Sequence, residues 1–251
     1  MQERHEFAVY YSQLSAQIKN VSDGQLFKVV DDTIIGRITH VLRLRAGEQV
    51  VFFDDQISIH CAIHAASKKE LQCTLLARHA HQVLKPAITF ILPLLKKDDF
   101  ETALYSLVEL GATTIQLVTT EKTQRSWGTE KEFDRCQRVM IAAAEQSKNF
   151  ALPALLAPIS LKNYLAQMAA LAVPKIYFDP QGVLAIELLT ALASKKPAHC
   201  MLLVGPEGDL TAIEKDALRT QGFEFCQLTP TVLRSVQAVA VGLGMMRSLV
   251  R

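Results

Sequence analysis

The arrangement of apolar and polar residues divides the chain into two parts with different periods. In the N-terminal third, short segments alternate between apolar and polar side chains, which is the pattern of β-strands buried on one face. Strands are expected at residues 49–54, 57–65 and 71–77. The turn-forming residues Asp54 and Asp55 lie between the first two, so these strands should form a hairpin.

One helix is expected among these strands. It follows Asp31 and should bury a single face made of Ile34, Ile38, Val41 and Leu42, which recur at helical spacing. The N-terminal part is therefore predicted to be a small, mainly β domain.

From Lys85 onward, apolar strands alternate with amphipathic helices. The expected strands are 87–94, 115–118, 175–178, 199–204 and 225–228, and the expected helices are 98–110, 133–147, 161–171, 183–193, 211–222 and 233–249. Such an alternation predicts an α/β domain with a mainly parallel sheet. The change of pattern lies at 81–86, so we expect a domain at 1–82 and a second at 83–251.

Two helix ends in the second part carry recognisable capping signals. Ser160 stands where it can cap the helix that begins at Leu161. Thr211 is followed three residues later by Glu214, which is the pattern of a capping box. Both helices should therefore begin at these residues.

Composition restricts the partners only weakly. The chain has 251 residues, 27 of them basic and 25 acidic, for a formal net charge of +2. This balance lacks the strongly basic character of a general nucleic-acid binder, so any RNA site should be a local patch.

Cysteine usage and hydropathy favour a cytoplasmic protein. The five cysteines are odd in number and form no CxxC pair, which is typical of reduced proteins. Residues 1–11 are charged and lack the apolar core of a signal peptide, and no apolar run approaches the roughly 20 residues that span a bilayer. We therefore expect a cytoplasmic location and no membrane partner.

A histidine-rich strand raises the question of a metal site. His60 and His64 flank Cys61, but alternation along a strand places the two histidines on one face and the cysteine on the other. The three side chains therefore cannot share one ion, and we expect no metal there.

Two strand-to-helix turns carry the candidate chemistry. Gly205-Pro206-Glu207-Gly208 follows an apolar strand and directly precedes a helix. In open α/β sheets, ligands bind beyond the carboxyl ends of strands, where glycines allow close approach and helix starts offer free N–H groups. Arg234 begins a helix after the next strand, which suggests that both turns border one pocket.

Short motifs along nearly the whole chain have a specific order. They are His40-Val41-Leu42-Arg43, Gly47-Glu48, Phe52-Phe53-Asp54, Glu109-Leu110-Gly111, Thr120-Glu121-Lys122, AAEQS at 143–147, VGPEG at 204–208 and LTPTVLR at 228–234. In this order they resemble the RsmE family, the bacterial 16S ribosomal RNA uracil-N3 methyltransferases of the SPOUT superfamily.

The resemblance implies a fold and an activity. The fold would be a PUA-like β-barrel RNA-binding domain at 1–82 followed by a SPOUT methyltransferase domain at 83–251 with a C-terminal trefoil knot. The enzyme would transfer a methyl group from S-adenosylmethionine to N3 of a uridine in 16S ribosomal RNA. It would work as a cytoplasmic homodimer and would need no metal.

The resemblance also implies site residues. The cofactor would be bound by Thr119, Val204, Gly205, Pro206, Glu207, Gly208, Leu228, Thr229, Val232, Leu233 and Ala238. Arg234 would act in catalysis by holding a uracil carbonyl oxygen or a phosphate, since a guanidinium does not act as a base. RNA would contact Arg4, Arg37, Arg43 and Arg45.

The chain departs from the family pattern within these motifs. Asp209 replaces a glycine, which we expect to have a positive φ that Asp tolerates better than most residues. Thr229 and Thr231 replace a glycine and an arginine, and Val236 replaces a glutamate. The lost glutamate is either dispensable or compensated by Glu207 or Glu145, unless the substrate has changed.

Some of these features allow more than one interpretation. Glu145 fits equally well as a buried structural residue paired with Lys148 or Arg138. An RNA-binding protein without efficient methyl transfer, or a SPOUT enzyme with another RNA target, stays open. A nicotinamide oxidoreductase fits poorly, because no glycine-rich fingerprint follows the first strand of the α/β part.

Overall fold

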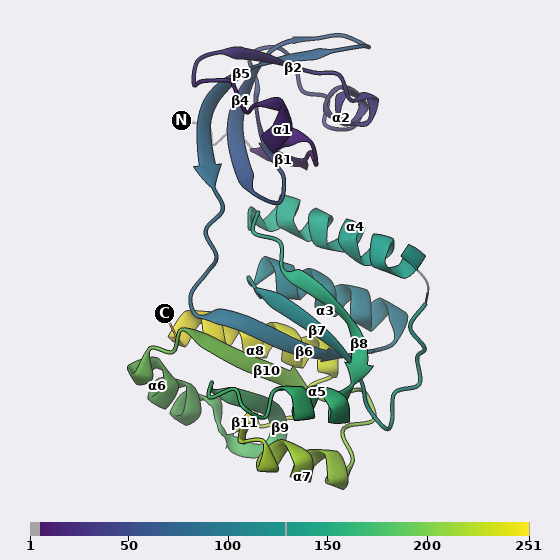
Figure 1. Ribbon diagram of the computed structural model, residues 1–251, viewed down its shortest axis with the longest axis vertical. Helices are drawn as coiled ribbons and strands as arrows, with labels where there is room; N and C mark the ends of the chain where they lie inside the picture. The colour runs from purple at the N-terminus through teal and green to yellow at the C-terminus, as the bar shows by residue number, and fades with distance from the viewer. Residues whose placement is uncertain (1–5, 129, 251) are drawn as a thin grey trace. The chain divides into compact units, whose positions relative to one another are not determined.

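The computed structural model describes residues 6–128 and 130–250, which form two compact units (Figure 1). One unit holds the chain up to Gln82 together with Ala144–Ala151, and the other holds Val83–Ala143 and the chain from Leu152 onward. Nothing in the sequence pattern indicated that 144–151 belongs with the N-terminal unit. Among the described residues, no helix has the length and apolar character needed to cross a bilayer.

The N-terminal unit is built on a five-stranded sheet. Its elements are β1 (Phe7–Tyr10), α1 (Leu14–Gln17), β2 (Leu26–Val29), α2 (Asp32–Gly36), the π-helical turn η1 (Arg37–Val41), β3 (Gln49–Phe53), β4 (Ile57–Ala66) and β5 (Leu71–Ala80). The strand order is β1-β3-β4-β5-β2, and only β1 and β3 run parallel. The three strands expected from the alternation are confirmed, whereas the short β1 and β2 were not expected.

The expected hairpin at Asp54 is also confirmed. Its carboxylate Oδ1 accepts hydrogen bonds from the backbone N–H groups of Gln56 (2.8 Å) and Ile57 (3.0 Å), so the side chain closes the turn between β3 and β4. An aspartate that bonds to the backbone two and three residues ahead is a common device for fixing a turn.

The helix after Asp31 begins as expected but changes its period. The Asp31 carboxylate accepts from the N–H groups of Thr33 and Ile34 and caps α2. Ile34 and Ile38 are buried, but Val41 is 72% exposed, so its place on the buried face was wrongly predicted. The cause is η1, because a π-helical turn holds more residues than an α-helical one and rotates Val41 away from the core.

The C-terminal unit is a six-stranded parallel sheet covered by helices. Its elements are β6 (Ala87–Pro93), α3 (Lys97–Glu109), β7 (Thr114–Thr119), α4 (Glu130–Ser147), β8 (Ala154–Ser160), α5 (Leu161–Gln167), β9 (Lys175–Leu184), α6 (Ala185–Lys195), β10 (His199–Val204), α7 (Ala212–Thr220), β11 (Phe223–Gln227) and α8 (Ser235–Leu249). The last residues of α4 cluster with the N-terminal unit. The strand order is β11-β9-β10-β6-β7-β8, and every pairing is parallel, which confirms the predicted α/β class.

The strand order creates a reversal of direction at β6. The chain leaves β6 toward β7 and β8 on one side, and it reaches β10 from β9 on the other side. The carboxyl ends of β6 and β10 therefore flank a topological switch point, where open α/β sheets bind ligands. α3 and α8 pack together on one face of the sheet, and α5 and α7 pack together on the other (Figure 1).

Helix starts follow the capping signals, but the boundary between β9 and α6 differs from expectation. Ser160 caps α5, and Thr211 and Glu214 form the complete capping box of α7, as expected. The helix expected from Val183 begins instead at Ala185, because Val183 and Leu184 pair with β11 and extend β9. Non-local strand pairing thus overrides a local helical pattern. The edge strand β8 was not expected.

One glycine of α8, Gly242, allows the helix to pack closely against a side chain of the sheet. Gly242 lies against the ring of Phe178, and a Cβ at this position would stand 2.4 Å from Phe178 Cε2. Phe178 is 6% exposed, so its ring has little room to move. Gly244, in the same helix, has no heavy atom from beyond the adjoining helix backbone within 4 Å of such a Cβ, among the described residues.

We predict that Gly242→Ala lowers the free energy of unfolding by about 1–3 kcal/mol, the usual cost of overpacking a core. Gly244→Ala is the matched control and should leave stability unchanged or raise it by up to about 1 kcal/mol, because alanine favours helix. Chemical denaturation of the two variants checks this, and equal stabilities would contradict the contact.

Candidate functional site

The two strand-end turns meet at a hydrogen bond. Ser235, the first residue of α8, donates from Oγ to the carbonyl oxygen of Gly205 at 2.7 Å. The turn after β10 is thereby tied to the segment 228–234 that follows β11. The structure brings together the two stretches that the sequence suggested would border one pocket.

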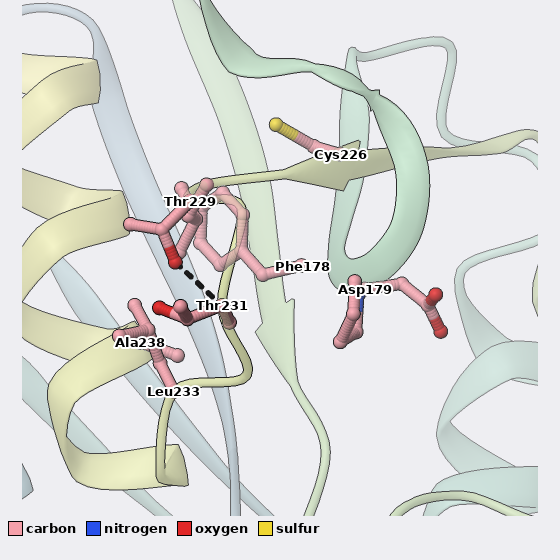
Figure 2. Close-up of a pocket in the computed structure, with 9 residues that line it drawn as sticks. Phe178, Asp179, Cys226, Thr229, Thr231, Leu233 and Ala238 are labelled. Atoms are coloured by element: carbon pink, nitrogen blue, oxygen red, sulfur yellow. Dashed lines mark hydrogen bonds between the residues drawn. The ribbon is translucent and has the colours of Figure 1, made fainter.

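A small cavity of about 50 Å³ opens beside this junction (Figure 2). It is lined by Phe178, Asp179, Pro180, Cys226, Leu228, Thr229, Thr231, Leu233 and Ala238. Thr229 donates from Oγ1 to the carbonyl oxygen of Thr231 at 2.7 Å, which closes the loop over one side of the cavity (Figure 2). We refer to it as the small cavity.

A larger and more polar opening, of about 840 Å³, lies at the carboxyl ends of β6, β7 and β10. It is lined by Leu94, Lys96, Lys97, Glu121, Lys122, Thr123, Gln124, Arg125, Glu207 and Gly208. None of these residues lines the small cavity. We refer to it as the polar cleft.

The residues expected to bind the cofactor distribute over both openings. Leu228, Thr229, Leu233 and Ala238 line the small cavity, and Glu207 and Gly208 line the polar cleft. Val204 is buried at the end of β10, Thr119 ends β7, and Val232 is 79% exposed. Arg234 is exposed at the start of α8, where its Nε donates to Gln237 Oε1 at 3.0 Å.

Sequence reasoning missed the residues that β9 and β11 contribute to the small cavity. Phe178, Asp179 and Pro180 lie in the middle of β9, and Cys226 lies in β11. The signal was present, because the strand predicted at 175–178 ends at the same edge of the sheet as β10. Applying the strand-end argument to that strand as well would have found them.

Cys226 is not a nucleophile in this cavity. Burial raises the pKa of its thiol to about 11, and the nearby Glu224 carboxylate acts in the same direction. The thiol is therefore protonated at neutral pH and contributes an apolar wall.

Asp209, which follows the turn, takes the expected conformation. Its φ is +58°, as expected for a position where the family has glycine. Its Oδ1 accepts hydrogen bonds from Tyr177 Oη and from its neighbour's N–H at Leu210, both at 2.7 Å. These local bonds offset part of the strain of the left-handed conformation.

The other oxygen of Asp209 joins a charged network with Lys215 and Asp179. Lys215 Nζ lies 2.7 Å from Asp209 Oδ2 and 2.7 Å from Asp179 Oδ2. The Asp179 side chain is only 3% exposed, and its Oδ1 accepts from the N–H of Gln181 at 2.8 Å. The network thus joins the turn after β10, helix α7 and the part of β9 that lines the small cavity.

The pKa shifts agree with this pairing. Burial favours the neutral form of Asp209, but hydrogen bonds from Lys215, Tyr177 and Leu210 outweigh it and lower the pKa of the carboxyl group. Burial likewise disfavours the charged form of Lys215, but its hydrogen bonds to Asp179 and Asp209 raise its pKa. Asp209 and Lys215 are therefore both ionised at neutral pH.

The arginines expected to contact RNA belong to the N-terminal unit, and those that the structure describes differ in their conformation and hydrogen-bond partners. The Arg37 guanidinium pairs with the Glu145 carboxylate, while Arg43 takes a φ of +56°. Arg45 donates its backbone N–H to Glu48 Oε2 and is exposed. Arg4 lies outside the described residues.

Glu145 is a structural residue, and of its two expected partners only Lys148 bonds to it, through the backbone carbonyl oxygen. Its carboxylate, only 10% exposed, accepts from Arg37 and from the backbone N–H of Tyr10 (3.0 Å), and not from Arg138. Lys148 donates its ammonium group to the Glu145 backbone carbonyl oxygen at 3.0 Å instead. Glu145 belongs to the N-terminal unit and does not line the small cavity or the polar cleft.

Comparison with known proteins decides the family. The "RNA methyltransferase domain" profile matches residues 83–247, and the "RNA methyltransferase PUA domain" profile matches residues 38–76. The chain belongs to the RNA methyltransferase domain family.

Relatives and solved structures of similar proteins extend over nearly the whole chain. Ribosomal RNA small subunit methyltransferase E of Mycobacterium bovis is 29% identical over 90% of this chain and 88% of its own. The enzyme of the same name from Neisseria gonorrhoeae, solved with S-adenosyl methionine, has a TM-score of 0.80 at 24% identity, covering 98% of both chains. A methyltransferase of Legionella pneumophila solved with its cofactor SAM has a TM-score of 0.79 at 21% identity, covering 98% of both chains.

These matches confirm the α/β fold class with a PUA-like domain. The trefoil knot stays a prediction.

Where the family motif has its glutamate, this chain carries Val236, which is 7% exposed and forms part of the buried face of α8.

We predict that Lys215→Met destabilises the protein by about 3 kcal/mol at neutral pH, because it leaves the buried Asp179 carboxylate without its cation. Lys162→Met, on the exposed surface of α5, is the control and should change stability by less than about 0.5 kcal/mol.

The loss of stability in Lys215→Met should be smaller at acidic pH than at neutral pH. The lowered pKa of Asp209 gives stability that is present above the ordinary aspartate pKa of about 3.9 and is lost as the pH falls through the folded value. The difference between wild type and Lys215→Met should therefore shrink below about pH 4. Denaturation at pH 7 and pH 3.5 measures it, and a constant difference would contradict the network.

Proposed function

We propose that this RNA methyltransferase domain protein transfers the methyl group of S-adenosylmethionine to N3 of a specific uridine in 16S ribosomal RNA. The observation that carries the proposal is the 29% identity, over 90% of the chain, to proteins named ribosomal RNA small subunit methyltransferase E. The N-terminal region 1–82 would bind the RNA and the region 83–251 would carry the reaction. The protein would act in the bacterial cytoplasm as a homodimer.

The small cavity has the chemistry that the adenosyl group of this cofactor needs. Phe178, Leu228 and Leu233 supply apolar walls for a purine ring. Within the described residues, no hydrogen bond is donated by the backbone N–H groups of Thr229 or Val232, which leaves them free for a ligand. At about 50 Å³ the cavity holds only part of such a group, so the irregular segment 228–234 would move on binding.

The polypeptide mainly has to position the reacting groups. The cofactor supplies a methyl group already activated by its sulfonium charge, so no covalent intermediate with the protein is required. The N3 proton of the uridine must leave, and the base must be unstacked to reach the pocket. Arg234, exposed at the start of α8, would hold a carbonyl oxygen of the base as negative charge develops there.

Glu207 is our proposed proton acceptor. Val236 has no proton-accepting group, and the Glu145 carboxylate is taken up by Arg37 and Tyr10 in the N-terminal unit. Glu207 lies in the turn itself, exposed, with Oε1 accepting the N–H of Lys96 at 2.8 Å. Its second oxygen has no partner among the described residues and is free to take a proton.

RNA-binding without efficient methyl transfer is the second candidate. The buried Val236 at the family's glutamate position favours it, because that site has lost its carboxylate. The two candidates differ in product but share an RNA-binding surface.

We predict saturable binding of S-adenosylhomocysteine, close to one molecule per chain, in a calorimetric titration. Incubation of small ribosomal subunits lacking the modification with S-adenosylmethionine should then yield one N3-methyluridine in 16S ribosomal RNA, detected by mass spectrometry of nucleosides. Cofactor binding without this product would favour the second candidate, and no cofactor binding would overturn the proposed reaction.

We predict that Arg234→Ala abolishes methyl transfer while cofactor affinity changes by less than about tenfold, since a guanidinium that stabilises developing charge acts mainly in the transition state. Arg138→Ala is the control, because Arg138 is exposed on α4 and has no side-chain partner in the described part of the chain. Full activity of Arg234→Ala in a single-turnover assay would remove this residue from the mechanism.

A further inference from the structure

The polar cleft lies at the topological switch point of the sheet. Its lining comes from the segments that follow β6 (Leu94–Lys97), β7 (Glu121–Arg125) and β10 (Glu207–Gly208). β6 lies between β10 and β7 in the strand order, so three adjacent carboxyl ends form one opening. This is where α/β sheets bind substrates, and about 840 Å³ is within the usual range for a ligand site.

Hydrogen bonds between the segments that line the cleft fix their positions relative to one another. The backbone N–H of Lys96 donates to Glu207 Oε1 at 2.8 Å, which joins the β6 and β10 walls. Lys122 Nζ donates to the carbonyl oxygen of Gly208 at 2.7 Å, which joins the β7 and β10 walls. The N–H of Glu121 donates to Glu214 Oε1 at 2.9 Å, which fixes the β7 wall to α7.

Two cations of the cleft are not held in a hydrogen bond or an ion pair. Within residues 6–128 and 130–250, this applies to the ammonium groups of Lys96 and Lys97, and both side chains are exposed. The charge of Lys97 acts on the nearby Glu101 carboxylate only as one of the lesser causes of its lowered pKa. By contrast, Arg125 is paired with Glu132 and lies over the ring of Phe100. The adjacent free lysines are therefore the groups available for an anion.

The charges of the two openings select different ligands. The small cavity is lined mainly by apolar side chains, and its one carboxylate, Asp179, is already paired with Lys215. The polar cleft has lysines at 96, 97 and 122 and an arginine at 125 against carboxylates at 121 and 207. Asp98 and Asp99, in the first turn of α3, do not line it. A ligand with a negative backbone and a polar ring fits the cleft better than a cation does.

We propose that the polar cleft binds a nucleotide of single-stranded RNA, with Lys96 and Lys97 paired with its phosphate. The amide of Gln124 and the second oxygen of Glu207 belong to the same lining and are suited to the polar edge of a base. The inference rests on the proposed function, because RNA is the substrate of that reaction. It adds the place at which the chain receives a nucleotide, separate from the small cavity.

The test uses the full-length protein, the oligonucleotide octauridylate and the double variant Lys96→Gln/Lys97→Gln. RNA affinity is measured by fluorescence anisotropy over a series of salt concentrations. On a single strand, the slope of log K against log salt falls by about 0.7 for each phosphate that the protein no longer neutralises. The variant should therefore have a slope smaller by about 0.7 to 1.4 and bind roughly tenfold more weakly at low salt.

The matched control is Lys195→Gln/Lys196→Gln, which removes the same charge from two adjacent exposed lysines at the end of α6. Its slope should stay close to that of the wild type. Thermal unfolding and S-adenosylhomocysteine titration of both variants verify that fold and cofactor site are intact.

The outcomes are distinguishable. A slope that falls only in the cleft variant supports the proposal, and equal slopes in the two variants, or no binding of octauridylate by the wild type, overturn it. Because the RNA measurement needs no cofactor, failure of the proposed methyl transfer would be seen as absence of N3-methyluridine from the ribosomal RNA, with the difference in RNA slope unaffected.

Discussion

The parallel pairing of β10 with β6 is the constraint on which the rest of the ligand-binding structure depends. It joins a strand from the first half of the C-terminal unit, Ala87–Pro93, to one reached much later, His199–Val204, and so creates the switch point. Both openings lie at the edge of the sheet that this pairing defines. The small cavity lies on the β9 and β11 side, and the polar cleft lies on the β6 and β7 side. Glu207 and Gly208 of the turn after β10 line the polar cleft, and Gly205 of the same turn accepts a hydrogen bond from Ser235, which follows the segment that lines the small cavity.

The structure explains how this chain accommodates Asp209 at a position where the family has glycine. The residue keeps a positive φ, and its side chain is used internally, by Tyr177 and Lys215, instead of being directed at a ligand. Lys215 in turn neutralises Asp179 in the wall of the small cavity. A substitution at the turn is therefore coupled to the shape of the cavity through a single lysine. The carboxylates of Asp209 and Asp179, which the sequence alone leaves without partners, are paired in the folded protein with the ammonium group of Lys215.

What the sequence could predict depended on whether the signal was local. The strand at 199–204 is apolar almost throughout and was predicted with the bounds that the structure shows, and the capping box of Thr211 and Glu214 set the start of α7. Val183 and Leu184 could not be placed, because their strand pairing is with residues more than 40 positions away. The same holds for the site. The glycine-rich turn was visible in the sequence, whereas the network of Asp179, Asp209 and Lys215 arises only when three segments meet.

The passage of β11 beside β9 bears on the predicted knot. Phe225 pairs with Tyr177, but the next residue, Cys226, pairs with Val183, so residues 178–182 loop out without a partner in β11. At the end of that loop, a Cβ on Gly182 would stand 2.3 Å from the carbonyl carbon of Phe225, so only glycine allows the two backbones to approach this closely. Asp179 in this loop and Cys226 in β11 both line the small cavity (Figure 2). Threading of β11 past a loop that needs glycine would thus form the cavity itself, and the knot and the cofactor site would be one structural feature.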